Sequence, residues 1–327
     1  MQMARGRKAA SVLTLFFCLI LFAGFGRAQA QQGPTAEPQL VILDTDIGDD
    51  IDDAFALGLA LRSPELKVLG ITTAYGDTEL RARLVDRYLA AVGADIPVAT
   101  GVPTPHSNVF SQAAYARREP DHEHPEAVEF LLSQIRRYPG QITLIGIGPL
   151  TNVEAAIKRD PETFRKLKRV VIMGGSIYRG YDGKQGVSHQ ADVEWNIKCD
   201  PAGAKALLAS GVPVFMMPLD STQIHLDAAR LQALFAVGSA VTDQLTLLYH
   251  QWTAGSDGQW GTPTLFDPVA VTYTIRPDLC PAKPMRIEVD DQGFTKPVAG
   301  EPNASVCLQS DEKGFLALLD ARLAGDK

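Results

Sequence analysis

The chain has 327 residues, enough for one large α/β domain or two ordinary ones. Its formal charge is −7, and it becomes −11 without residues 1–30, which hold four basic residues and no acidic ones. An acidic balance of this size argues against nucleic acid and anionic membrane surfaces as partners.

Residues 1–30 have the pattern of a secretory signal peptide. A basic start is followed by an apolar run over residues 11–24 and by Ala28-Gln29-Ala30, a small-residue cleavage site. The apolar run is shorter than the roughly 20 residues of a membrane span. We therefore expect a secreted or periplasmic protein with no membrane association after cleavage near Ala30, and an uncleaved anchor is the alternative.

Three cysteines follow the expected cleavage site: Cys199, Cys280 and Cys307. In an exported protein Cys280 and Cys307 could form a disulfide, and the alternative is three buried thiols. Cys199 is expected to be a packing residue.

Strands and helices alternate along the rest of the chain. Residues 31–39 are expected to be a flexible leader, and residues 40–327 a single domain. Strands are predicted at residues 41–43, 66–73, 96–99, 142–147, 169–173 and 212–218, with a final pair at 285–289 and 305–308. Helices are predicted at residues 54–61, 79–92, 125–138, 202–209 and 314–323, after Asn152, within 227–252 as one or two helices, and from Asp267 onward. This order favours an α/β fold with a mostly parallel central sheet and helices on both faces, Rossmann-like, with ligands beyond the carboxyl ends of the strands.

Six aspartates follow the first predicted strand within ten residues: Asp44, Asp46, Asp49, Asp50, Asp52 and Asp53. No Lys or Arg lies within this run, and both flanks are apolar. Carboxylates held so close together repel one another unless some are protonated or a cation lies among them, and Ca²⁺ or Mg²⁺ is the simplest cation.

Two familiar motifs do not fit this stretch. An EF-hand loop that begins at Asp44 would need a carboxylate at its twelfth position, which is Phe55. Phosphatases of the haloacid dehalogenase type usually carry Thr or Val where this chain has Gly48.

The aspartate run resembles the N-terminal signature of the inosine-uridine type nucleoside hydrolases, DxDxGxDDxxAL, with two extra residues between the glycine and the paired aspartates. Four later segments resemble further motifs of that family, in the same order: Gly148-Pro149-Leu150-Thr151-Asn152, Met173-Gly174-Gly175, Ala191 to Ile197 with Asp200-Pro201, and Leu265 to Ala270. The resemblance implies a nucleoside hydrolase-like fold and release of a free base and ribose from nucleosides.

The resemblance also implies a Ca²⁺ site. Asp46, Asp53 and Asp267 would supply carboxylates and Thr151 its backbone carbonyl, and Asp46 would be the general base for a water. In the alternative without a metal, Asp267 is only a helix N-cap before Pro268, and Asp53 is only a helix N-terminal residue. Asp44 is expected to brace the loop rather than bind metal, and Asp49 and Asp50 receive no role.

The sugar would be held by other residues that the resemblance implies. Asp52 would bind the 2′-hydroxyl, and Glu194 and Asn196 the 3′- and 5′-hydroxyl side. Asp77 occupies a position where the family usually has Asn, and it would be a weaker ribose contact. Relatives are commonly dimers or tetramers, so a homodimer or homotetramer is expected by analogy.

The leaving-group acid stays unassigned. Many relatives have a histidine where this chain has Phe266, and the family's other histidine segment is absent from residues 100–125, an irregular stretch predicted to be a lid or specificity loop. Candidate acids are His122, His124, His189 and His250. Aromatic candidates that could stack the base are Tyr178, Tyr249, Trp252 and Trp260.

Two other functions compete with hydrolysis. An exported ribose- or nucleoside-binding protein would keep the metal site but have little turnover, and the loss of a histidine at Phe266 motivates this alternative. A metal-dependent phosphatase would need a basic phosphate cradle, which the surroundings of the aspartate run lack.

Overall fold

The computed structural model describes residues 37–105, 109–182, 186–255 and 261–325. The predicted signal peptide and most of the predicted leader lie outside these residues. Gln39, expected to be the last leader residue, is instead the first residue of β1. The described residues belong to one compact unit that starts at Glu37.

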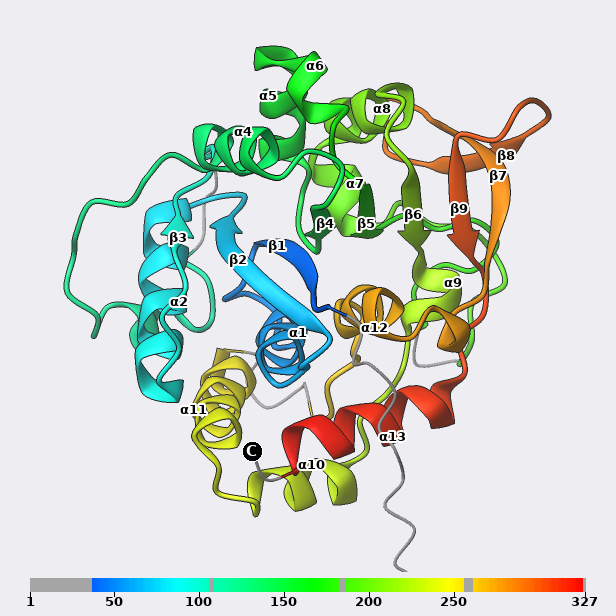
Figure 1. Ribbon diagram of the computed structural model, residues 1–327. Helices are drawn as coiled ribbons and strands as arrows, with labels where there is room; N and C mark the ends of the chain where they lie inside the picture. The colour runs from blue at the N-terminus through cyan, green and yellow to red at the C-terminus, as the bar shows by residue number, and fades with distance from the viewer. Residues whose placement is uncertain (1–36, 106–108, 183–185, 256–260, 326–327) are drawn as a thin grey trace, which may run out of the picture. The chain divides into compact units, whose positions relative to one another are not determined.

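A nine-stranded sheet forms the centre, in the order β3-β2-β1-β4-β5-β6-β9-β7-β8 (Figure 1). The strands are β1 (Gln39–Thr45), β2 (Leu66–Thr73), β3 (Val98–Ala99), β4 (Thr143–Gly146), β5 (Arg169–Met173), β6 (Val214–Met217), β7 (Ala282–Val289), β8 (Thr295–Val298) and β9 (Ala304–Cys307). β1 to β6 and β9 pair in parallel, whereas β7 is antiparallel to both β8 and β9. The predicted mostly parallel sheet is confirmed, and β8 is a strand that the sequence analysis missed.

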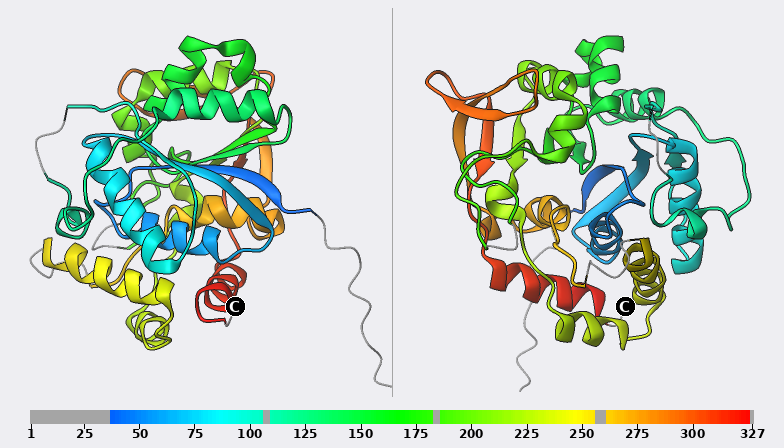
Figure 2. Two further views of the ribbon diagram at one scale, coloured as in Figure 1. Left: turned by 60° about the vertical axis from the view of Figure 1, so that its left-hand side comes forward. Right: turned by 180° about the vertical axis from the view of Figure 1, so that it is seen from behind.

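Helices cover both faces of the sheet, as predicted (Figures 1 and 2). On one face lie α1 (Asp52–Leu61), α2 (Thr78–Val92), α3 (Ala113–Ala116), α11 (Ala240–Gly255), α12 (Pro268–Ile275) and α13 (Glu312–Leu323). On the other lie α4 (Ala127–Arg137), α5 (Thr151–Arg159), α6 (Pro161–Phe164), α7 (Trp195–Cys199) and α8 (Pro201–Ala209). The remaining short elements are α9 (Leu219–Thr222), α10 (Ala228–Phe235) and the 3₁₀ turn η1 (Pro277–Leu279).

The pleat of β1 explains why two hydrophobic cores form. Val41 and Leu43 pack into the core beneath α1, whereas Ile42 packs into the core on the opposite face. Successive side chains of a strand point to opposite faces, so a strand buried on both sides must be apolar throughout. The continuous apolar run that begins β1 follows from this geometry.

α1 is buried along almost its whole length, because it packs against β2 as well as α11, α12 and α13. Gly58 allows part of this packing, since a Cβ there would lie 3.0 Å from the Tyr88 hydroxyl and 3.1 Å from Val241. None of the described helices combines the length and apolar character needed to cross a bilayer.

The two edges of the sheet are short. β3 has two residues, and β8 has four with Pro297 among them. Cys280 and Cys307 form a disulfide that ties the turn before β7 to the end of β9, so of the two alternatives that the sequence left open the structure has the bridge.

The strand order reverses between β1 and β4. The chain leaves β1 toward β2 and β3 on one side and then returns to β4, β5 and β6 on the other. A crevice opens at the carboxyl ends of strands where such a reversal occurs, and it is the usual ligand site of open α/β sheets.

Candidate functional site

A cavity of about 640 Å³ lies at the carboxyl ends of β1, β4 and β5, within the size range of ligand sites. Asp46 follows β1, Ile147 follows β4 and Met173 ends β5. The full lining comprises Asp46, Asp49, Asp50, Asp52, Asp53, Val109, Ser111, Ile147, Met173, Tyr181, Glu194, Trp195, Asn196, Gly255, Phe266 and Asp267.

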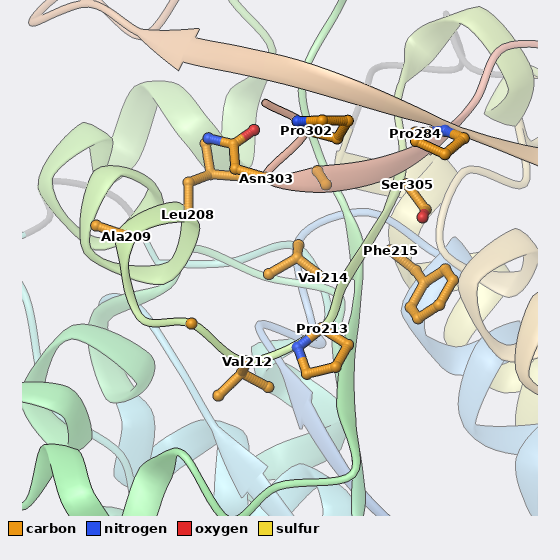
Figure 3. Close-up of a pocket in the computed structure, with 12 residues that line it drawn as sticks. Leu208, Ala209, Val212, Pro213, Val214, Phe215, Pro284, Pro302, Asn303 and Ser305 are labelled. Carbon is orange, nitrogen blue, oxygen red and sulfur yellow. The ribbon is translucent and has the colours of Figure 1, made fainter. Parts of the chain in front are cut away.

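A second cavity of about 410 Å³ lies at the opposite end of the strands, where residues 212–214 lead into β6 (Figure 3). Apolar side chains, prolines, Asn303 and Ser305 line it, and it contains no ionisable side chain. The chemistry therefore points to the aspartate-lined cavity.

Three buried carboxylates meet in the aspartate-lined cavity. Asp52, Asp53 and Asp267 offer oxygens that all lie within 4.8 Å of one another, and each side chain is at most 5% exposed. Asp52 and Asp53 form the first turn of α1, and Asp267 directly precedes α12. Residues 214 apart in sequence thus form one cluster, here called the aspartate cluster together with Asp46.

Asp267 is not a side-chain cap of α12. Asp267 occupies the N-cap position before Pro268, as predicted, but its backbone is helical and its carboxylate accepts no capping hydrogen bond. Its backbone N–H instead donates to Asp52 Oδ2 at 3.1 Å. The Asp267 carboxylate is therefore left to the cluster.

Burial and mutual repulsion raise the pKa values of the aspartate cluster. Burial raises the pKa of Asp53 well above its usual value, with the charges of Asp46 and Asp52 adding to the effect. Burial likewise raises the pKa of Asp46 to about 7, although Arg81 opposes the shift. A hard dication among these oxygens would favour their charged forms, and an all-oxygen donor set suits Ca²⁺ or Mg²⁺. The residues present therefore fit the expected metal.

Gly148 allows Asp46 to reach its place. A Cβ at residue 148 would lie 2.8 Å from Asp46 Oδ1 and 2.9 Å from its backbone nitrogen. Residue 148 is a glycine because Asp46, the candidate general base, lies too close for a side chain at this position.

Thr151, the expected carbonyl ligand, is not among the residues that line the cavity. It is the first residue of α5, where a carbonyl accepts an intrahelical hydrogen bond. Ile147 forms the cavity wall at this strand end instead. The sequence analysis missed Ile147 because an apolar residue at a strand end carries no ligand signal.

Asp44 braces the end of β1, as expected. Its Oδ1 accepts hydrogen bonds from the Thr72 hydroxyl and from Asn152 Nδ2, the latter at 2.7 Å. The Asn152 Oδ1 also accepts from Val102 N–H at 2.8 Å. Asn152, in the turn that resembles a family motif, therefore connects three segments and has a structural task.

Glu194 and Asn196 line the cavity from α7, a helix that the sequence analysis did not predict. The Glu194 carboxylate accepts N–H groups of Gly175, Asn196 and Ile197 at 2.8 to 3.1 Å, and burial raises its pKa to about 7. Asn196 Nδ2 donates to the Met173 carbonyl at 3.2 Å. Both side chains are held in place by backbone groups next to the cavity.

Asp77 has a different place from the one expected. Its Oδ1 accepts the Leu80 N–H at 3.0 Å and so caps α2, and Asp77 is not among the residues that line the cavity. The carboxylate serves the helix N-terminus, where an acidic cap is stabilising.

Comparison with known proteins gives the decisive observation. A family model described as inosine-uridine preferring nucleoside hydrolase matches residues 41–317. The chain belongs to this nucleoside hydrolase family. Members of the family are N-glycosidases, so the predicted family and enzyme class are confirmed.

Individual relatives cover almost the whole chain. A pyrimidine-specific ribonucleoside hydrolase of Citrobacter koseri is 34% identical, over 87% of this chain and 97% of its own length. Uridine nucleosidase 1 of Arabidopsis thaliana is 30% identical, over 86% and 92%. Among solved structures, a plant nucleoside hydrolase superposes with a TM-score of 0.76 at 26% identity, covering 88% of this chain and 100% of that one. A purine-preferring ribonucleoside hydrolase from Gardnerella vaginalis superposes with a TM-score of 0.73 at 26% identity, covering 88% and 98%.

A separate segment holds the backbone of Asp49 and Asp50, the two residues expected to be extra relative to the family signature. Ser111 donates its hydroxyl to the carbonyls of Gly48 and Asp49, and Gln112 Nε2 donates to the Asp50 carbonyl at 2.7 Å. The Phe110 ring packs against Gly48, whose φ is +128° and where a Cβ would lie 2.7 Å from the ring. The stretch expected to be a lid or specificity loop therefore contributes to the site through residues 109–112.

Arg81 is the residue near the site that sequence reasoning missed. It is 2% exposed, and it donates to the carbonyls of Asp46, Ile47 and Tyr75 and to Asp49 Oδ2. The aspartate run itself contains no Lys or Arg, but Arg81 supplies a positive charge from α2. A charged residue on the buried side of α2, one turn before Leu84 and Val85, was the available signal.

An aromatic wall closes one side of the cavity. The Tyr181 ring meets Phe266 edge-on at 6.1 Å, and the backbone N–H of Trp195 donates to the Tyr181 hydroxyl at 2.9 Å. The aromatic residues expected to stack a base lie elsewhere: Trp252 is buried in the core, Tyr249 packs against Phe235, Tyr178 does not line the cavity, and Trp260 is outside the described residues.

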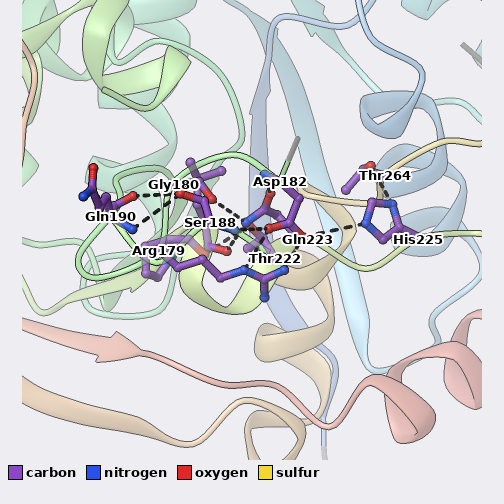
Figure 4. Close-up of polar contacts among 11 residues, drawn as sticks. Arg179, Gly180, Asp182, Ser188, Gln190, Thr222, Gln223, His225 and Thr264 are labelled. Atoms are coloured by element: carbon purple, nitrogen blue, oxygen red, sulfur yellow. Dashed lines mark hydrogen bonds and ion pairs between the residues drawn. The ribbon is translucent and has the colours of Figure 1, made fainter. Parts of the chain in front are cut away.

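The loop that carries Tyr181 is anchored on both sides (Figure 4). The Asp182 N–H donates to Gln223 Oε1 at 2.6 Å, and Gln223 Nε2 donates to the Gly180 carbonyl at 3.0 Å. The Asp182 carboxylate accepts the Ser188 N–H and pairs with Arg179. These bonds fix the backbone on either side of Tyr181 and thereby the position of its ring.

No histidine is among the described residues that line the cavity. His122 and His124 contact Asp86, and His189 and His250 are exposed and absent from the cavity lining. The four candidate acids are therefore not brought to this site.

Proposed function

We propose that the protein hydrolyses the N-glycosidic bond of ribonucleosides with the help of Ca²⁺, releasing a free base and ribose. The observation that carries this proposal is the aspartate cluster at the floor of a ligand-sized cavity, with Glu194 and Asn196 beside it.

Asp46, Asp53 and Asp267 would hold the ion, with Ile147 rather than Thr151 as the adjacent backbone position. When bound, Ca²⁺ would orient the ribose diol and make a nearby water more acidic. Asp52, Glu194 and Asn196 would bind the sugar hydroxyls, with Asp52 on the 2′ side.

Asp46 would act as general base. It accepts a proton from the attacking water while the water oxygen bonds to C1′. The bond between C1′ and the base nitrogen breaks, and its electron pair leaves with the base. The sugar becomes oxocarbenium-like on the way, and the surrounding carboxylates stabilise its positive charge.

The base would lie against Trp195, Tyr181 and Phe266. With no described histidine at the cavity, the leaving base would take its proton from solvent. Relatives of the protein include both a pyrimidine-specific and a purine-preferring hydrolase, so a test of base preference needs both classes of nucleoside.

The test is hydrolysis of inosine, adenosine, guanosine, uridine and cytidine by the mature protein, with and without a Ca²⁺ chelator. We expect chelator-sensitive release of base. p-Nitrophenyl riboside, which needs no leaving-group acid, and p-nitrophenyl phosphate serve as controls.

Turnover of the riboside but of no nucleoside would show that base activation is lacking. No turnover of any substrate, with nucleoside and metal still bound, would favour the binding protein instead. Turnover of the phosphate would favour the phosphatase.

We also propose that the protein is exported after removal of residues 1–30. The disulfide between Cys280 and Cys307 supports this, because such bonds persist in oxidising compartments. A homodimer or homotetramer is proposed by analogy with the family.

A further inference from the structure

A second group of metal-binding side chains lies outside the aspartate-lined cavity. Asp86 on α2 meets His122 and His124, which precede α4, and we call these three residues the histidine cluster. None of the three lines the aspartate-lined cavity.

The geometry brings both imidazoles to one carboxylate oxygen. His124 Nε2 lies 2.7 Å and His122 Nε2 3.5 Å from Asp86 Oδ2. The two rings pack with centroids 4.2 Å apart, and the three ligand atoms lie within 4.8 Å of one another. Bonds of about 2 Å from a tetrahedral zinc ion place ligand atoms about 3.3 Å apart, close to the His122 separation, so His124 would only have to move outward by about 0.6 Å.

The segment that carries the histidines is fixed against α2 without any metal. Arg83, one turn before Asp86, donates to the carbonyls of Arg117 and Glu119. Arg87 stacks on the Tyr115 ring at 4.0 Å and donates to its carbonyl. These bonds hold residues 115–119 against α2, and the contact of His124 with Asp86 positions two of the three ligands before an ion arrives, which reduces the cost of binding.

Charge and exposure also suit a cation. A metal dication binds an imidazole through the lone pair of a ring nitrogen, and this cluster offers two imidazoles beside one carboxylate. Asp121 and Glu123 flank His122 in the sequence, so the segment that carries the two histidines is acidic. The His122 side chain is 51% exposed and that of His124 is 5% exposed. An ion would therefore enter from solvent on the side of His122, and His124 would bind it on the buried side.

We propose that the histidine cluster binds a transition-metal dication of the Zn²⁺ class, with water as the remaining ligand. Two nitrogens and one oxygen form a softer donor set than the aspartate cluster, and imidazole selects Zn²⁺, Ni²⁺ or Cu²⁺ over Ca²⁺. The ion would clamp the segment before α4 to α2.

The experiment measures Zn²⁺ binding to the mature, tag-free protein by equilibrium dialysis and elemental analysis, with Ca²⁺ in excess to occupy the aspartate cluster. We expect one Zn²⁺ per chain. His122→Ala should weaken Zn²⁺ binding by at least about tenfold, since even outer-shell partners contribute that much. His250→Ala, which removes an exposed histidine from α11, is the matched control and should bind as the wild type does.

Two further readouts separate this site from catalysis. Co²⁺ in place of Zn²⁺ should give visible absorption in the wild type that is absent in His122→Ala. Nucleoside hydrolysis should be equal in both proteins. Equal Zn²⁺ stoichiometry and affinity in the wild type and His122→Ala, or no binding by the wild type, would overturn the proposal.

Discussion

The aspartate cluster and the histidine cluster hold ligand atoms at similar separations in opposite surroundings. In the aspartate cluster every donor is a carboxylate oxygen, and the side chains are nearly or fully buried. In the histidine cluster a single carboxylate faces two imidazoles, one of them half exposed. Burial makes the first cluster costly without a cation, whereas the second is satisfied by ordinary hydrogen bonding. The difference teaches that an ion or protons must offset charge repulsion in the aspartate cluster, whereas the histidine cluster has no such electrostatic need.

Removing one carboxylate charge from each cluster should give the largest difference in nucleoside turnover. Asp53→Asn should abolish Ca²⁺ binding and lower nucleoside turnover by about 10²-fold or more, because both the ion and its effect on water are lost. Asp86→Asn should leave turnover unchanged. Elemental analysis and initial rates test both variants, and equal losses would show that the clusters are not independent.

Replacing the arginine near each cluster compares how much each arginine contributes to the free energy of unfolding. Arg81→Met should lower the free energy of unfolding by about 3 kcal/mol or more, since buried carbonyls of Asp46, Ile47 and Tyr75 lose their donor. Arg83→Met should cost less, because water can reach the carbonyls that it serves. Urea unfolding with Ca²⁺ present measures the two changes, and a larger effect at Arg83 would contradict the role of burial.

A substitution that disturbs the close packing beside Asp46 should have a smaller effect on stability and turnover. Gly148→Ala should destabilise the protein by about 1–3 kcal/mol and lower kcat, because the new methyl group displaces Asp46. Gly261→Ala is the control, since a Cβ there meets no atom within 4 Å. Wild-type rates in Gly148→Ala would show that the position of Asp46 is not critical.

The smallest effect is a dependence of stability on pH. Burial raises the pKa of Asp44 to about 6 and of Asp46 to about 7, above their values in the unfolded chain. The folded state therefore holds extra protons, and this stabilisation is complete below about pH 4 and is lost as pH rises through 6 and 7.

Calcium-free protein should thus melt at least about 3 °C lower at pH 8 than at pH 5. Excess Ca²⁺ should flatten this slope, because the cation favours the charged carboxylates. Differential scanning calorimetry at both pH values tests this, and a calcium-free Tm that rises with pH would contradict it.

Much of the sheet and part of the site could be predicted from the sequence. β2 and β5 begin and end at the predicted residues, because buried parallel strands are apolar without interruption. Asp46, Asp52, Asp53 and Asp267 were assigned to one site on motifs, and they do lie together. β8, with a lysine and a proline in four residues, lacked the apolar run that marked the other strands.

Long-range contacts explain what the sequence did not reveal. Arg81 reaches the aspartate run from another helix, and Tyr181 reaches the cavity because Gln223 anchors its loop. Asp77 and Thr151 were placed by motif position, yet one caps α2 and the other begins α5. A motif indicates which segment approaches a site, but local backbone geometry decides which atom of that segment faces it.

The edges of the central sheet limit how copies of this chain can associate. β3 offers two residues for pairing with a neighbouring strand, and on β8 Pro297 has no N–H to donate. Neither edge is a good template for a strand from another molecule. Assembly into dimers or tetramers would therefore join helices and loops, and the same edges would resist the strand-by-strand growth that leads to fibrils.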